Sequence, residues 1–352
     1  CMQECSACLS PHFGITNGAM AVALDPKTIV NIHGLYAPPF VSSDFRFTVK
    51  LDDEPVEATV CEWLPNNVLA ARNSGPIKVE SSVNMVYGQR GVSIVVTVMP
   101  GDGRKSVRLT GEFSGTLDVN TTWEFARPKS TTATTHSIQD GVFLLTQGGN
   151  AIALTNITYP DKPPVSIELD PVTRKWSSEI PIYPDEECGY IEFGIGIGNQ
   201  FAAIASAKEA CKFDRILDAS AHLSLNQRVS ALFERVPRFE SDNKSLERLY
   251  NRSLVPALLN KWEVPEFKLN PYYSTGSING GCLCNYLWDF GEVWEILPMI
   301  DPDATKAHIK HFLSVDLTKH FAFLPITGEG FGPWYMVNQE KITGLVYYYV
   351  MV

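Results

Sequence analysis

The sequence lacks a cluster of basic residues and a long apolar run, and each absence excludes a class of partner. Lysine and arginine number 29 against 39 aspartates and glutamates in 352 residues, and the formal net charge is -10. Because phosphate binding needs clustered Lys and Arg, this composition argues against a nucleic-acid partner and favours a neutral or cationic ligand. No apolar run approaches the roughly 20 residues that span a bilayer, so we expect a soluble protein with no membrane partner.

A regular cysteine pattern is also missing. The eight cysteines are scattered along the chain, whereas a small secreted protein would space them as a disulfide framework. We therefore expect reduced thiols, which favours the cytoplasm. The chain begins with Cys1 rather than Met and shows no signal segment, so we expect its true start to be missing. The spacing of Cys1, Cys5 and Cys8 is that of an iron–sulfur motif, but the strands that follow do not suit one, and we expect no cluster.

Residues 12 to 210 show the period of two that is typical of strands. In the segment 46–52, Phe47, Val49 and Leu51 alternate with polar residues, as in a half-buried strand. Segments 92–100 and 106–113 flank the turn sequence GDGRK and predict a hairpin. Further strands are expected at 141–147, 151–158, 165–170 and 189–198. Short strands between Gly, Pro, Asn and Asp clusters predict an antiparallel β-sandwich over residues 1–211.

The period becomes helical after residue 211. The apolar residues of 223–236 fall on one stripe, which predicts a linker helix within 212–238. Further stripes predict helices through 246–258, 283–297, 303–313 and 342–350, with Asp303 as the N-cap of the third. Long loops at 263–281 and 324–335 each precede an even-numbered helix, so in an up-and-down array they share one end. That end is the predicted functional end. The last helix stops at Val352 in midstream, so we expect the chain to be cut there as well.

Acidic and aromatic side chains gather at this predicted end. Sugars present polar rims and apolar C–H faces, so their sites combine carboxylates with aromatic rings. The sequence therefore predicts a saccharide site made of Trp288, Asp289, Glu329, Trp334 and Tyr335. The alternatives remain open at this point: Asp289 could cap a helix end, and the glycine-rich loop around Glu329 could be structural.

Other patterns carry no expected site. Tyr272 and Tyr273 suit either a sugar platform or packing against the sandwich. The run GIGIG at 194–198 lacks the spacing of a dinucleotide motif. His308 and His311 lack the glutamate and spacing of a zinc protease, and we expect both to be exposed. No metal and no cofactor is predicted.

The strand-rich first half, the linker helix and three sequence segments together resemble a known family. The segments are LWDFGE at 287–292, DPDATKAHIKHFL at 301–313 and GPWYMVNQE at 332–340. They resemble the (α/α)6-toroid glycoside hydrolases: glucoamylases, trehalases, processing α-glucosidases and bacterial α-rhamnosidases. The resemblance implies an N-terminal antiparallel β-sandwich followed by the first helices of an (α/α)6 toroid. The expected domains are the sandwich at 1–211, the linker helix at 212–238 and a truncated catalytic domain at 239–352.

The resemblance also implies a function. In these families the early Asp of such a motif recognises sugar hydroxyls, and the catalytic acid and base come from later loops. Asp289 is thus expected to bind substrate, with both catalytic carboxylates beyond Val352, so that the 352 residues alone would be inactive. The implied activity is that of an inverting α-glycosidase acting on oligosaccharides. A sugar phosphorylase of the same architecture and a non-catalytic carbohydrate-binding module are the alternatives.

Overall fold

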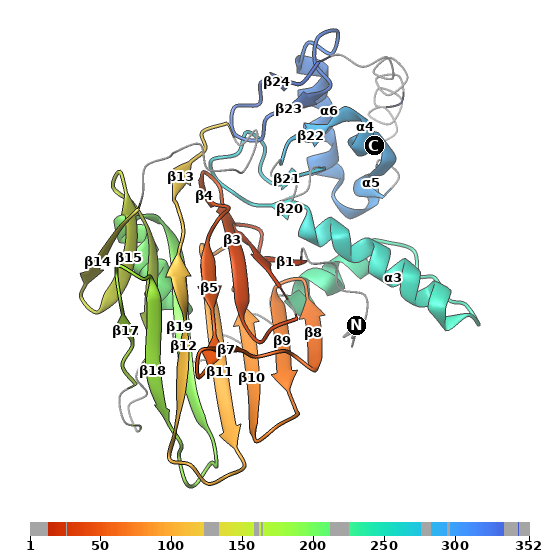
Figure 1. The fold of residues 1–352 in the computed structure, drawn as a ribbon. Helices are drawn as coiled ribbons and strands as arrows, with labels where there is room; N and C mark the ends of the chain where they lie inside the picture. The colour runs from red at the N-terminus through yellow and green to blue at the C-terminus, as the bar shows by residue number, and fades with distance from the viewer. Residues whose placement is uncertain are drawn as a thin grey trace. The chain divides into compact units, whose positions relative to one another are not determined.

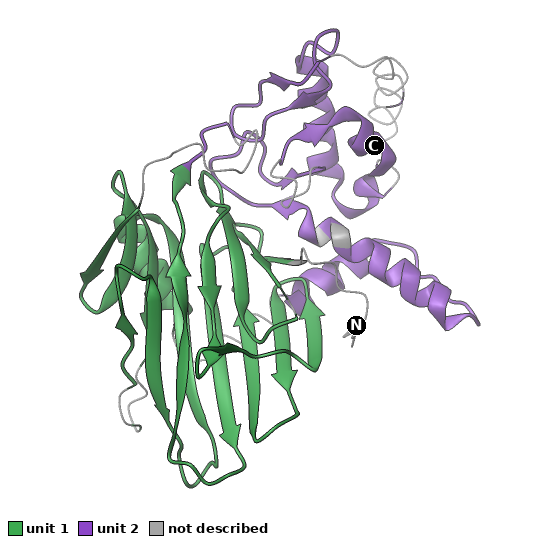
Figure 2. Cartoon of the chain, in the orientation of Figure 1, with its two compact units in different colours: residues 1–118, 127–224 green, residues 119–126, 225–352 purple. Residues whose placement is uncertain are grey.

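The computed structural model describes residues 13–25, 27–122, 134–157, 162, 165–211, 225–275, 283–293, 296–333 and 344. The chain divides into two compact units, one of residues 1–118 and 127–224 and one of residues 119–126 and 225–352 (Figure 2). Residues 225–238, placed in the predicted linker, group with the second unit. Across the described part of the chain, no helix is long and apolar enough to cross a membrane.

Two large antiparallel sheets make up most of the first unit (Figure 1). The eight-stranded sheet runs in the order β14 (Thr135–Gln139), β15 (Val142–Gln147), β16 (Asn150–Asn156), β19 (Gly189–Asn199), β11 (Gly91–Pro100), β10 (Ile77–Asn84), β9 (Asn67–Arg72) and β8 (Val60–Leu64). The main path of the eleven-stranded sheet is β1 (Phe13–Thr16), β2 (Ala21–Leu24), β3 (Asn31–Ala37), β5 (Arg46–Thr48), β12 (Ser106–Ser114), β18 (Lys175–Pro181) and β17 (Glu168–Leu169). Off this path lie β4 (Phe40–Ser42), β6 (Lys50–Leu51), β7 (Glu54–Pro55) and β13 (Asp118–Val119).

The hairpin predicted across GDGRK is wrong. Strand β11 pairs with β10 and β19, whereas β12 pairs with β18 in the other sheet. The turn at 101–105 therefore carries the chain from one sheet to the other. Both strands bury one face in the shared core, so their alternation of apolar and polar residues is the same as in a hairpin.

Aromatic side chains join the two sheets in the core of the first unit. The ring of Phe47 on β5 lies 5.1 Å from that of Phe193 on β19, and the ring of Trp176 on β18 is also 5.1 Å from Phe193. Phe47 and Trp176 stack at 5.9 Å. Gly111 on β12 leaves room for the indole, because a Cβ atom there would lie 2.4 Å from the Trp176 Nε1. These rings are large, fully buried and come from both sheets, so they fix how the sheets face each other.

The GIGIG run of β19 is a packing surface for a helix. Helix α1 (Gln200–Ala210) follows the strand directly, with the Asn199 side chain accepting a hydrogen bond from the Ala202 N–H as the N-cap. A Cβ atom at Gly194 would lie 2.0 Å from the Ala207 carbonyl oxygen, and one at Gly196 would lie 2.3 Å from that of Ala203. The glycines therefore let the helix backbone approach the sheet closely.

This packing predicts that Gly194→Ala and Gly196→Ala each lower the free energy of unfolding by about 2 kcal/mol, because the added methyl group meets rigid backbone. Gly198→Ala is the matched control, since its Cβ would lie 3.3 Å from the Ala202 Cβ and meet no carbonyl that closely. We expect the control to change the free energy by less than about 0.5 kcal/mol. Urea unfolding followed by far-ultraviolet circular dichroism measures all three, and equal losses would contradict this account of the run.

The second unit combines short helices with very short strands (Figure 1). Residues 225–233 are helical, and α3 (Lys244–Leu259) is followed by the paired strands β20 (Lys261–Trp262) and β21 (Tyr272–Tyr273). A small sheet joins β22 (Asn285–Tyr286), β23 (Ala322–Phe323) and β24 (Gly330–Phe331). The remaining helices are α4 (Leu287–Val293), α5 (Leu297–Ile300) and α6 (Pro302–Ser314).

The predicted fold class is wrong. The structure is mostly β with large antiparallel sheets, and it is not a sandwich followed by the first helices of an (α/α)6 toroid. The helix expected over 283–297 is divided into β22, the seven-residue α4 and the four-residue α5. Leu283 and Leu287 are buried on either side of β22, four residues apart, and so mimicked a helical stripe. Asn285 pairs with Phe323 and Tyr286 with Ala322.

The structure also bears on the N-cap of α6 and on the helix expected at the end of the chain. Asp301, not Asp303, is the N-cap of α6, because its side chain accepts a hydrogen bond from the Ala304 N–H at 3.1 Å. The expected helix at 342–350 lies outside the described residues apart from Gly344. The domain limits 1–211, 212–238 and 239–352 stay predictions.

Candidate functional site

A cavity of about 310 Å³ lies within the second unit, between the C-terminal half of α3, the end of β21 and helices α4 and α5. Its polar lining comes from Ser253, Asn260, Ser274, Thr275, Asp289 and Glu292. Its apolar lining comes from Ala257, Tyr273, Phe290, Val293, Ile296, Leu297 and Ile300. The cavity thus combines two carboxylates, an amide and three hydroxyl groups with two aromatic rings.

Tyr273 forms one wall of this cavity and is held through both its backbone and its side chain. Its N–H donates a hydrogen bond to His308 Nε2 at 3.1 Å, and its carbonyl oxygen accepts one from Asn285 Nδ2 at 2.7 Å. Its hydroxyl group donates to Asp301 Oδ2 at 3.1 Å. All three partners come from outside β21, so this strand has one position relative to α6 and β22.

The two residues that follow Tyr273 are fixed in the same way. The Ser274 N–H donates to the Asn260 carbonyl oxygen at 2.9 Å, and the Ser274 Oγ accepts a hydrogen bond from Trp262 Nε1 at 3.2 Å. The Thr275 Oγ1 accepts one from the Tyr286 N–H at 2.7 Å. Because the serine oxygen is used as an acceptor, its O–H remains able to donate to a ligand.

His308 is the buried centre of this wall. It is 0% exposed, so the expectation that this histidine is exposed is wrong, and His311 is half-buried. The His308 Nδ1 lies 2.7 Å from the Ala304 carbonyl oxygen, which can only accept, so Nδ1 carries the proton and Nε2 accepts from Tyr273. The imidazole stacks on the Phe290 ring at 5.7 Å. Burial lowers the pKa of His308 to about 4, which keeps the ring neutral.

Asp289 and Glu292 stand three residues apart on α4, and both line the cavity. Spacing of three places two side chains on the same side of a helix. The helix is anchored by the Leu287 N–H, which donates to the Phe321 carbonyl oxygen at 2.8 Å, and by Phe290, which is fully buried. Asp289 and Glu292 are exposed, whereas Phe290 and Gly291 between them are buried.

A lysine and two carboxylates form a charged group near the Tyr273 hydroxyl. Lys261 Nζ lies 3.5 Å from both Glu263 Oε1 and Asp301 Oδ2. Burial, and then the charge of Asp301, raises the pKa of Glu263. Burial also raises the pKa of Tyr273, and the nearby Asp301 raises it further, so this phenol stays protonated as a hydrogen-bond donor.

The structure brings one of the five predicted site residues, Asp289, to this cavity. Trp288 is 51% exposed and is not among the lining residues. Glu329 is exposed in the connection between β23 and β24, beside Gly328, whose carbonyl oxygen lies 2.8 Å from His311 Nε2. Trp334 and Tyr335 lie outside the described residues. Binding roles for these four remain predictions.

The Lys268 N–H donates to the Pro325 carbonyl oxygen at 2.7 Å, so loops 263–275 and 324–331 are in contact. The up-and-down helical array from which the sequence placed loops 263–281 and 324–335 at one end is not the fold of this unit. Sequence reasoning missed Asn260, Ser274, Thr275 and Glu292 as lining residues. The spacing of Glu292 from Asp289 could have identified it. The other three line the cavity because of contacts between distant segments, which no local sequence pattern predicts.

Comparison with known proteins identifies a shared fold. No protein-family model and no curated protein matches the sequence. A bacterial glucoamylase whose crystal structure was solved with acarbose superimposes with a TM-score of 0.60 at 10% sequence identity, covering 99% of this chain and 59% of the glucoamylase chain. The chain has a glucoamylase-like fold. It therefore spans about 59% of the length of that enzyme, and at such low identity the likeness concerns the fold alone.

Two further solved structures overlap only in part. A putative aldose 1-epimerase from Escherichia coli K12 covers 53% of this chain and 98% of its own, at 11% identity and a TM-score of 0.29. A glycoside hydrolase family 81 protein from Clostridium thermocellum matches 55% of this chain with 23% of its own, at 12% identity and a TM-score of 0.29. Scores this low carry no argument about this chain.

The buried imidazole predicts how stability depends on pH. The folded chain keeps His308 neutral down to about pH 4, whereas the unfolded chain binds the proton near pH 6.5. The free energy of unfolding should therefore fall as pH decreases from about 6.5 to about 4, by about 3 kcal/mol from this residue. His308→Gln keeps a donor and an acceptor but does not titrate. Since His136 and His311 also have lowered pKa values, the measurement is the difference in pH slope between variant and wild type; identical slopes would refute the role of His308.

Proposed function

We propose that this chain is the substrate-binding part of a glycoside hydrolase, and in finer form of an inverting α-glycosidase that acts on oligosaccharides. The observation that carries the proposal is the position of Asp289: a residue expected to bind sugar hydroxyls lines a cavity of about 310 Å³ in a chain with a glucoamylase-like fold. That glucoamylase was solved with acarbose, which supports a saccharide as the ligand class here. The volume falls at the lower end of the roughly 300–1,000 Å³ of small-molecule sites.

The chemistry of the lining suits a sugar ring. The carboxylates of Asp289 and Glu292 accept hydrogen bonds from hydroxyl groups, while the Asn260 amide and the Ser274 hydroxyl donate to them. Val293, whose side chain is 39% exposed, and the half-buried Ala257 and Ile296 supply apolar surface for the C–H face of a sugar. A site of this kind positions a substrate and does not by itself cleave it, because glycoside hydrolysis also needs a general acid and a general base.

Preorganisation strengthens the case for binding. Tyr273, Ser274 and Thr275 each form hydrogen bonds with residues outside β21, so their positions are set before any ligand arrives. A wall that is already ordered loses little conformational entropy on binding. The energy of the new hydrogen bonds then appears as affinity.

Asp289→Asn should weaken maltotriose binding about tenfold or more, because hydrogen bonds to a charged acceptor contribute about 1.5–3 kcal/mol. The fold should persist, since the side chain is exposed and the substitution keeps its shape. Asp242→Asn is the control, an exposed aspartate of the same unit that does not line the cavity. Isothermal titration gives the affinities and thermal melting checks the fold. Equal affinity in both variants would exclude Asp289 from the site.

Turnover separates the enzymatic alternatives in the whole protein. A hydrolase should release glucose from maltotriose in phosphate-free buffer, and proton NMR of the first product should show the β anomer if the reaction inverts an α linkage. Release that requires phosphate would identify a phosphorylase. Binding without turnover under either condition would leave the carbohydrate-binding module and overturn the hydrolase.

A further inference from the structure

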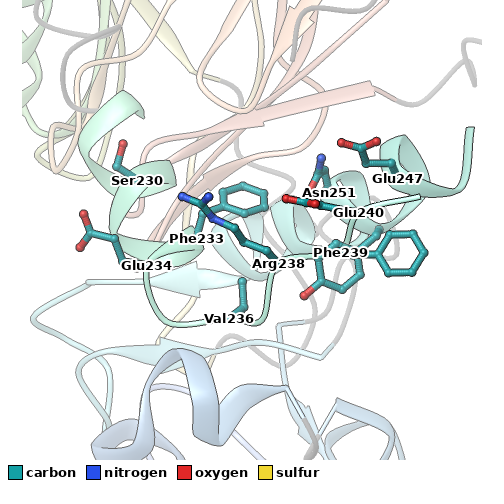
Figure 3. A pocket seen from close by; sticks show the side chains of 10 residues that line it. Ser230, Phe233, Glu234, Val236, Arg238, Phe239, Glu240, Glu247 and Asn251 are labelled. Carbon is teal, nitrogen blue, oxygen red and sulfur yellow. The ribbon is translucent and has the colours of Figure 1, made fainter. Parts of the chain in front are cut away.

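A second cavity of about 680 Å³ lies within the same unit and shares no lining residue with the first. It is an open groove between the helical residues 225–233, the segment 234–240 and the N-terminal half of α3 (Figure 3). Ten side chains line it, and Figure 3 shows that they include acidic, basic, amide and aromatic groups. Neither the sequence patterns nor the likeness to glucoamylase assigns this groove a role.

An aromatic pair forms a platform in the groove. The rings of Phe239 and Tyr250 lie 5.4 Å apart and are inclined by 37°. The Tyr250 hydroxyl donates a hydrogen bond to the Pro237 carbonyl oxygen, which ties α3 to the segment that carries Phe239. Phe239 is 40% exposed although it is a phenyl group. A ring that is held in place yet open to solvent offers a flat apolar face to a ligand.

The charged groups of the groove are available for binding. The side chains of Glu234, Arg238 and Glu240 make no hydrogen bond or ion pair within the described residues. Glu247 differs, because its carboxylate pairs with Lys244 at 2.7 Å. One guanidinium and two carboxylates therefore line the groove without a hydrogen-bonding partner among the residues that the structure describes.

This mixture of signs decides the class of ligand. A polyanion would meet Glu234 and Glu240, and a polycation would meet Arg238, each at an electrostatic cost. Hydroxyl groups donate and accept at once, so a neutral polyol satisfies both signs, while the C–H face of its ring covers the aromatic pair. We propose that the groove is a second saccharide-binding site, separate from the cavity of Asp289.

The test is isothermal titration of the 352-residue chain with maltoheptaose. Phe239→Ala removes the platform and Arg238→Gln removes the donor, and each should weaken one class of binding site about fivefold or more. Matched controls exist for both: Phe201→Ala deletes an 84% exposed phenyl group in the first unit, and Arg252→Gln changes an exposed arginine of α3 outside the groove. Because the side chain of Arg238 is exposed and pairs with none of the described residues, its variant still reports on binding if Phe239→Ala loosens the fold.

The outcomes separate this site from the first. Loss of affinity in both groove variants, with unchanged binding in both controls, supports the proposal. Groove variants that bind like their controls overturn it. Tight binding of spermine that Glu234→Gln with Glu240→Gln abolishes, with maltoheptaose unaffected, overturns it in favour of a cationic ligand. If Asp289→Asn binds like wild type while the groove variants fail, the groove stands and the proposed function of the first cavity does not.

Discussion

The backbone hydrogen bonds of Tyr273 hold the second unit's cavity in shape. The Tyr273 N–H donates to His308, and its carbonyl oxygen accepts from Asn285, so one residue of a two-residue strand connects α6 with β22. A strand this short has almost no ladder of its own, and its register depends on these side chains. The same histidine stacks on Phe290, which follows Asp289, so the position of α4 and the position of the wall depend on one buried imidazole.

The order of the first unit could be predicted from sequence more reliably than that of the second. Strands such as β11, β12 and β19 bury a full face, so their period of two is strong and their limits came out within a few residues. Which sheet each strand joins depends on distant partners, as the crossing between β11 and β12 shows. In the second unit, apolar residues of 283–297 fell at helical spacing although they belong to a short strand, a short helix and a turn, and the single helix predicted there rested on that spacing.

The candidate site divides in the same way. Asp289 could be found because an acid between aromatic residues is unusual on an apolar helix face. Ser274 and Thr275 could not, because their positions depend on hydrogen bonds from Trp262 and Tyr286, which the sequence pattern does not show. The histidine itself was misjudged as exposed, since a lone polar residue on a helix gives no sign of a buried acceptor role.

The crossing of the chain between the sheets affects how the protein is made. Strand β19 is the inner neighbour of both β11 and β16, and Val95 pairs with Glu192 almost a hundred residues later. On the ribosome the strands up to β11 emerge long before their neighbour exists, leaving an open apolar edge in the nascent chain. Completion of the eight-stranded sheet must therefore wait for residues 189–199, and α1, which seals the glycine surface, arrives immediately afterwards.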